Sequence, residues 1–134
     1  MMPKLERVDP FDCLFIGCNN GYLFEWSINK RKVNHEYNKF MDSSIHTMAI
    51  TYDRKKLFIT DVKGNLKMLD PEYHKVAKNF GQAHDTKIES ICITKDNKFM
   101  FTCDSTRILK QWSIPEKILY QNYGVVIGKG CIRS

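Results

Sequence analysis

Several features that would place this chain in a specialised class are scarce or missing. Its 134 residues include only seven glycines and four prolines, so neither a collagen-like nor a low-complexity composition fits. No apolar run reaches the length of a membrane span. Residues 1–13 mix charge with proline and lack the apolar stretch of a signal peptide. We therefore expect neither a membrane span nor secretion.

Cysteine is present, but without the spacing of a disulfide scaffold or a metal site. The chain has five cysteines, an odd number, and no pair of them is separated by two residues. Cys13 and Cys18 have four residues between them and no histidine cluster nearby. The pattern indicates small buried apolar side chains in a reducing compartment, and hence a cytoplasmic protein with no metal.

No catalytic constellation is recognisable either. His84 has no serine or cysteine nucleophile patterned with it. Glycines flank Lys129, but no Ser or Thr follows that lysine as in a phosphate-binding loop. The sequence therefore predicts that the protein is not an enzyme and holds no cofactor.

What the sequence does contain is an internal repeat of 43 residues. Shifting the chain by this period, without gaps, brings residues 14–16 (Leu-Phe-Ile) onto 57–59 (Leu-Phe-Ile) and then onto 100–102 (Met-Phe-Thr). The same shift pairs Gly21 with Gly64, and Trp26 with Leu69 and Trp112. Fixed self-similarity of this length is typical of repeat architectures such as solenoids and propellers.

Within one period the local signals are short strands separated by turn formers. Residues 45–51 and 88–94 are rich in β-branched residues and end in the polar clusters 52–55 and 95–98. Residues 57–60 and 99–103 are nearly all apolar, as in strands buried on both faces. No segment has apolar residues at helical spacing over a helix length. The pattern predicts an all-β fold with four strands per period.

Residues 57–70 and 100–113 resemble the WD40-repeat family. Trp26-Ser27 and Trp112-Ser113 stand in the place of the family's Trp-Asp dipeptide, where Leu69-Asp70 keeps only the acid. Ala83-His84 is similar to the family's Gly-His pair. The resemblance implies a structural role for these positions, namely Trp26, Leu69, Trp112, His84, Gly21 and Gly64.

The family also links a His, a Ser or Thr, an Asp and the Trp by hydrogen bonds within a blade. In the third copy the resemblance assigns three of these places to His84, Thr102 and Trp112. The place of the acid falls on Thr106, and on Lys63 and Asn20 in the other copies. We therefore expect an incomplete network, with the blades held mainly by apolar packing.

The expected fold is thus a partial WD40-type β-propeller of about three four-stranded antiparallel blades. We interpret residues 1–134 as a single unit, with repeats 14–56, 57–99 and 100–134 and with 1–13 as the end of a preceding blade unit. Residues 131–134 align with 88–91 and predict the start of another strand. A closed ring takes four to eight blades. We therefore expect a fragment of a longer propeller, an oligomer that completes a ring, or a chain capped by a partner subunit.

For such a fold, the leading functional hypothesis is a non-catalytic scaffold for other protein subunits. The expected contact positions are the turns between second and third strands and the segments before each first strand. They comprise Asn19, Asn20, Met41, Asp42, Lys63, Asp85, Lys87, Ser105, Thr106 and Arg107.

Two other hypotheses remain open. The net charge of +6 allows binding to RNA, DNA or an acidic cytoskeletal filament, although no nucleic-acid signature accompanies it. A third hypothesis is an enzyme subunit that only positions other components. Abundant Lys, Ile, Asn, Phe and Tyr is what an AT-rich genome encodes, as in ciliates, which makes a ciliary or other cytoskeletal role attractive.

Overall fold

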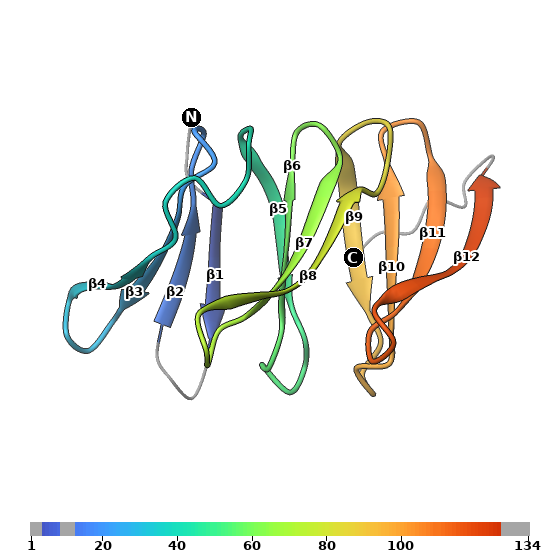
Figure 1. Ribbon diagram of the computed structural model, residues 1–134. Coiled ribbons are helices and arrows are strands. Elements are labelled where there is room, and N and C mark those ends of the chain that lie inside the picture. The colour runs from blue at the N-terminus through green and yellow to red at the C-terminus, as the bar shows by residue number, and fades with distance from the viewer. Residues whose placement is uncertain (1–3, 9–12, 127–134) are drawn as a thin grey trace.

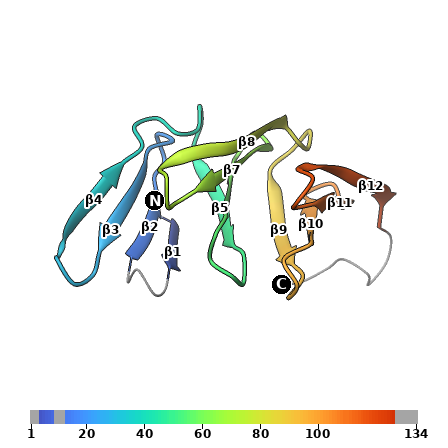
Figure 2. The same ribbon diagram turned by 60° about the horizontal axis from the view of Figure 1, so that its bottom comes forward.

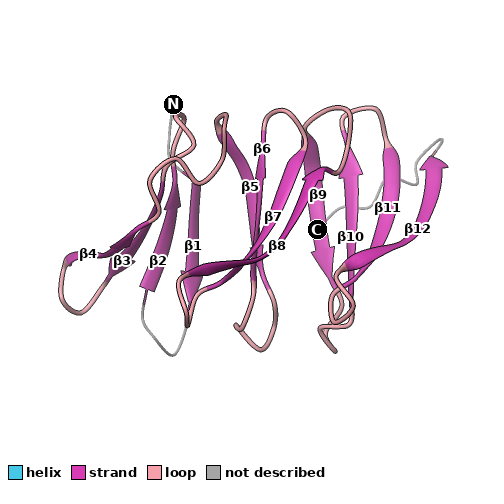
Figure 3. Ribbon diagram, viewed as in Figure 1, coloured by secondary structure: helices cyan, strands magenta, loops and turns pink. Residues whose placement is uncertain are grey.

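The computed structural model describes residues 4–8 and 13–126, and this part of the chain is all β, as predicted (Figure 3). The strands form three antiparallel sheets of four strands each. The first sheet contains β1 (Lys4–Val8), β2 (Cys13–Gly17), β3 (Leu23–Ser27) and β4 (Lys32–Glu36). The second contains β5 (Ile45–Ile50), β6 (Leu57–Asp61), β7 (Asn65–Asp70) and β8 (Lys75–Gln82). The third contains β9 (Ile88–Ile93), β10 (Phe99–Asp104), β11 (Ile108–Ser113) and β12 (Ile118–Val125).

In each sheet, neighbouring strands are also neighbours along the chain. The three sheets stand side by side in a row, with the first and third at opposite ends (Figures 1 and 2). The first strands of the sheets lie next to one another, because β1 contacts β5 and β5 contacts β9. The described row does not close on itself.

The sequence repeat and the hydrogen-bonded sheet are offset from each other. The unit 14–56 holds β2, β3, β4 and β5, whereas the first sheet runs from β1 to β4. Residues 1–13 thus contribute β1, which pairs with β2 along its whole length. The strand predicted to begin at 131–134 lies outside the described residues.

Two apolar cores hold the sheets together, one in each gap. Phe15 and Leu23 of the first sheet pack with Leu57, Ile59 and Leu69 of the second. On the other side of the second sheet, Phe58, Leu66 and Met68 pack with residues of the third sheet. These are Ile88, Met100 and Trp112. Every residue of β6 is buried as a result, because the second sheet is covered on both faces.

β2 shows the other case, since buried and half-buried residues alternate along it. Burial on both faces was predicted for residues 57–60 and 99–103. It holds for β6, whereas Phe99 and Phe101 of β10 are only half-buried. The part of the chain that the structure describes contains no helix with the length and hydropathy needed to cross a bilayer.

Candidate functional site

The predicted contact residues gather on one edge of the row of sheets. We call this edge the upper rim, at the top of Figure 1. It consists of the turns β2–β3, β6–β7 and β10–β11 together with the connections β4–β5 and β8–β9. The topology therefore brings together segments that are up to about two repeat periods apart in sequence.

Backbone hydrogen bonds tie these turns to the connections beside them. The amide of Ile45 donates to the carbonyl of Cys18 at 3.1 Å, and the amide of Val62 donates to that of Ser44 at 2.9 Å. One repeat further on, the amide of Ser105 donates to the carbonyl of Lys87 at 3.1 Å. Because each connection is held between the turns of two successive sheets, the rim is a fixed surface rather than a set of independent loops.

Gly21 and Gly64 allow close contacts of the turns β2–β3 and β6–β7. Both are buried and have φ of +86°, in the left-handed region that favours glycine. A Cβ on Gly64 would collide with the carbonyl oxygens of His84 and Thr86. Glycine therefore lets the β6–β7 turn lie directly against the β8–β9 connection.

Nine of the ten predicted contact residues are exposed, and one is not. The exposed residues are Asn19, Asn20, Asp42, Lys63, Asp85, Lys87, Ser105, Thr106 and Arg107. Met41 is only 1% exposed and belongs to the core between the first and second sheets. Its side chain is therefore not presented to a partner, and we leave it out of the upper-rim surface.

The upper rim carries charges of both signs. Lys63, Lys87 and Arg107 lie among the acidic residues Asp42 and Asp85. Lys87 Nζ is 3.9 Å from Glu89 Oε1, with both side chains nearly half exposed. Solvent screens such a pair strongly, so its charges remain available to a partner.

Beneath this rim, a chain of side-chain hydrogen bonds runs through the third sheet. His84 Nδ1 lies 2.9 Å from Asp104 Oδ2, and His84 Nε2 lies 2.7 Å from Thr102 Oγ1. Trp112 Nε1 donates to the same Thr102 oxygen at 2.9 Å. A neutral His84 with its proton on Nδ1 satisfies all three contacts at once, donating to Asp104 and accepting from the Thr102 hydroxyl.

The expectation of an incomplete network is therefore wrong for the third sheet. Asp104, the last residue of β10, supplies the acid that was assigned to the position of Thr106. Thr106 is exposed and itself donates to Asp104, from its amide at 2.9 Å and from its hydroxyl at 2.6 Å.

A signal for this acid was present in the sequence. Asp61 stands one period before Asp104, also at the end of a second strand. Its carboxylate accepts from the amides of Lys63 and Asn65. The repeated acid, rather than the centre of the turn, marks the position that bonds the histidine. In the first copy the position of this acid is Cys18. In the second copy Asp61 is present, but the position of His84 is Met41.

The surroundings of the His84–Asp104 pair explain its protonation. Burial lowers the pKa of His84 below its ordinary value of 6.5, against the opposing effect of Asp104. Burial acts to raise the pKa of Asp104, but hydrogen bonds from Thr106, the Ile108 amide and His84 outweigh it and hold this pKa below 3.8. The pair is thus a neutral imidazole bonded to a carboxylate, which fits a structural role.

The three residues in the Trp-Asp position have different surroundings. Leu69 is fully buried between the first and second sheets, and Trp112 is 6% exposed between the second and third. Phe80 meets the Trp112 ring edge-on at 5.4 Å between centroids. Trp26 is only half-buried, because its face of the first sheet has no further described sheet against it.

The described residues contain no group of three or more His, Cys, Asp or Glu arranged to hold a metal ion. No model of a known protein family matches the sequence, and no curated protein matches it.

Proposed function

We propose that the chain is part of a WD40-type β-propeller and serves as a non-catalytic scaffold for other protein subunits. The sheets support the propeller, since they repeat every 43 residues and place their first strands side by side. The hydrogen bonds among His84, Thr102, Asp104 and Trp112 add a side-chain arrangement that the family resemblance implies. Location in the cytoplasm, in a cytoskeletal or ciliary assembly, belongs to the same proposal.

The observation that carries the scaffold role is the upper rim. Exposed residues of mixed chemistry stand on a surface whose backbone is held between sheets by hydrogen bonds. Such a surface binds a partner without first losing much loop entropy, which favours protein recognition.

The outer faces of the end sheets support completion of the ring by further blades. Leu14, Ile16 and Trp26 of the first sheet are half-buried, whereas their equivalents Leu57, Ile59 and Leu69 are completely buried against it. At the other end, Phe101 and Leu109 are the half-buried equivalents of the fully buried Phe58 and Leu66. The two open faces thus repeat the two surfaces that already pack together within the chain. A head-to-tail contact between copies would join them.

The test of the upper rim is a triple substitution, Lys63→Ala, Lys87→Ala and Arg107→Ala. The matched control removes three positive charges from exposed sites elsewhere, with Lys32→Ala, Lys78→Ala and Lys95→Ala. In quantitative affinity capture from cell extract, we expect the rim variant to lose at least tenfold of a bound acidic partner that the control variant retains. Equal capture by both variants would reject this rim.

The same capture separates the scaffold from a polyanion binder. A contact with about six to ten phosphates loses orders of magnitude in affinity between 50 and 200 mM salt. We expect a milder salt dependence, because Asp42 and Asp85 interrupt the positive charge of the rim. Binding of single-stranded DNA to both variants, with a steep loss in salt, would favour the polyanion hypothesis instead.

A further inference from the structure

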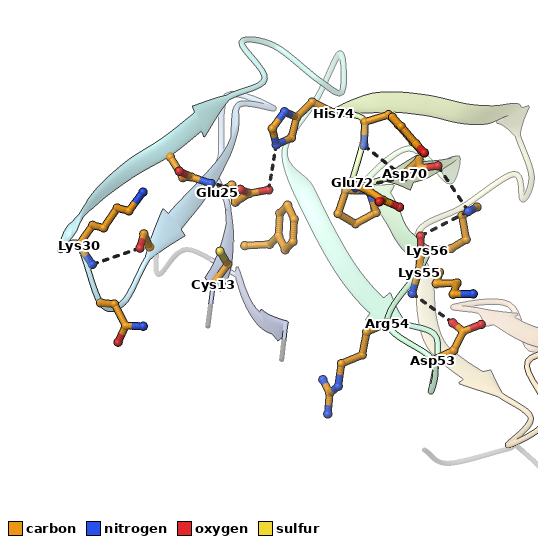
Figure 4. Close-up of a pocket in the computed structure, with 16 residues that line it drawn as sticks. Cys13, Glu25, Lys30, Asp53, Arg54, Lys55, Lys56, Asp70, Glu72 and His74 are labelled. Atoms are coloured by element: carbon orange, nitrogen blue, oxygen red, sulfur yellow. Dashed lines mark hydrogen bonds and ion pairs between the residues drawn. The ribbon is translucent and has the colours of Figure 1, made fainter. Parts of the chain in front are cut away.

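A pocket of about 730 Å³ opens between the first and second sheets on the edge opposite the upper rim (Figure 4). The first sheet lines it with Cys13, Phe15 and Glu25, and the second sheet with the turns 53–56 and 70–74. The volume is in the range of small-ligand sites. No part of the proposed scaffold surface lies in this pocket.

The repeat explains why the pocket forms in this gap. Between the second and third sheets, Met68, Trp112 and Ile114 are buried in the equivalent places. One period earlier these positions are Glu25, Leu69 and Pro71. Two smaller side chains and one charged side chain replace three large apolar ones, so the first gap is left open, with a carboxylate on its wall, where the second is filled.

Glu25 is a buried carboxylate with few polar partners. Its side chain is 7% exposed, and it accepts a hydrogen bond from Asn34 Nδ2 at 2.5 Å. His74 Nε2 lies 3.6 Å from its other oxygen, across the gap (Figure 4). Within the described part of the chain, no lysine or arginine is within ion-pair distance of Glu25. A buried carboxylate without a lysine or arginine partner is costly, and a bound cation lowers that cost.

A hydroxyl and aromatic rings surround the same carboxylate. The Tyr37 hydroxyl is buried and has no hydrogen-bond partner among the residues that the structure describes. Burial raises the pKa of Tyr37, and the charges of Glu25 and Asp70 raise it further. The rings of His35 and His74 stack at 4.1 Å between centroids, and Tyr37 meets both edge-on. Of these three residues His74 lines the pocket, together with the aromatic residues Phe15 and Tyr73, so a planar cation on Glu25 would lie among rings.

We propose that this pocket binds an arginine side chain of a partner protein, with the guanidinium on Glu25. Arginine fits better than lysine because its planar group binds a carboxylate through two hydrogen bonds and stacks on rings. The nearby Lys56 is already engaged, with Nζ 3.6 Å from Asp70 Oδ2. Lys30 and Lys55 are exposed, and both line the pocket. These two lysines suit acidic residues that flank the arginine in the partner.

The probe for this site is N-acetyl-L-arginine N-methylamide, with the citrulline analogue as its uncharged isostere. In two-dimensional NMR titrations of the intact chain, we expect saturable shifts of the Glu25, Asn34 and His74 amides with the arginine probe. The citrulline probe should bind at least tenfold more weakly. Equal affinity for the two probes, or no saturable shift with arginine, would overturn the proposal.

Two substitutions of Glu25 sharpen the test. Glu25→Gln should weaken the arginine probe at least tenfold, whereas Glu36→Gln, at an exposed site on the neighbouring strand, should not. Glu25→Met introduces the residue that the second sheet has in this place, so it should fold and abolish binding. Unchanged binding by either Glu25 variant would contradict the site. The upper-rim triple variant should bind the probe normally, so this result is independent of the scaffold test.

Discussion

His84, Thr102, Asp104 and Trp112 show how much one carboxylate matters at the scale of single residues. All four are buried, so any polar atom among them that loses its partner has no water to replace it. Asp104 accepts hydrogen bonds from the His84 ring, the Thr106 hydroxyl and two backbone amides. It therefore fixes the histidine and closes the β10–β11 turn at the same time.

We expect Asp104→Asn to lower the free energy of unfolding by about 2 kcal/mol or more, since it removes the charged acceptor of His84 Nδ1 and places an N–H donor there. Thr106→Val is the matched comparison and should cost at most about 1 kcal/mol, because Thr106 is exposed and keeps its amide hydrogen bond. Urea denaturation of both variants measures the difference. A larger loss of unfolding free energy for Thr106→Val than for Asp104→Asn would contradict the role assigned to Asp104.

At the scale of elements, the backbone repeats as faithfully as the side chains do. Positive φ recurs at Gly21, Gly64 and Arg107, which are one period apart, and at Arg31, His74 and Lys117. These positions lie in tight turns between strands, where left-handed residues match the twist of a hairpin. The turn geometry therefore persists even where glycine has been replaced, as at Arg107.

Gly64→Ala tests the contact between a turn and a connection. The new Cβ combines left-handed strain with a collision against backbone carbonyls, so we expect a loss on the order of 3 kcal/mol or more. Gly81→Ala is the control, because Gly81 also has a positive φ, of 67°, but nothing within 4 Å of the added carbon. It should cost about 1 kcal/mol. Similar losses in thermal denaturation would show that the close approach at the rim is unimportant.

For the whole molecule, the open faces of the end sheets predict self-association. Light scattering coupled to size-exclusion chromatography should show a discrete dimer, in which the outer face of one copy's third sheet covers the other's first sheet. Trp26→Glu and Phe101→Glu each place a charge on one open face and should yield monomers. Val76→Glu, at a 43% exposed site on the middle sheet, should leave the dimer intact. A folded monomer of the unmodified chain would contradict ring completion by a second copy.

Much of the fold was predictable because its signals are local. Turn formers and alternating apolar residues recur every 43 residues, so the strands and their grouping into fours follow from contacts between chain neighbours. The positions on the upper rim followed from the same period. Met41 was placed there by its sequence position, but burial depends on the Phe40 and Ile45 side chains that pack in the same core.

The sequence by itself determined the strand pattern and the turns, since both depend on residues close together in the chain. Only the tertiary structure decided which strand faces are covered, that Asp104 rather than Thr106 bonds His84, and that Glu25 lines an open gap. Each of these depends on what another strand or sheet places opposite a side chain. Glu25 and Met68 occupy equivalent positions, yet one lines a pocket and the other fills a core because the neighbouring sheets differ.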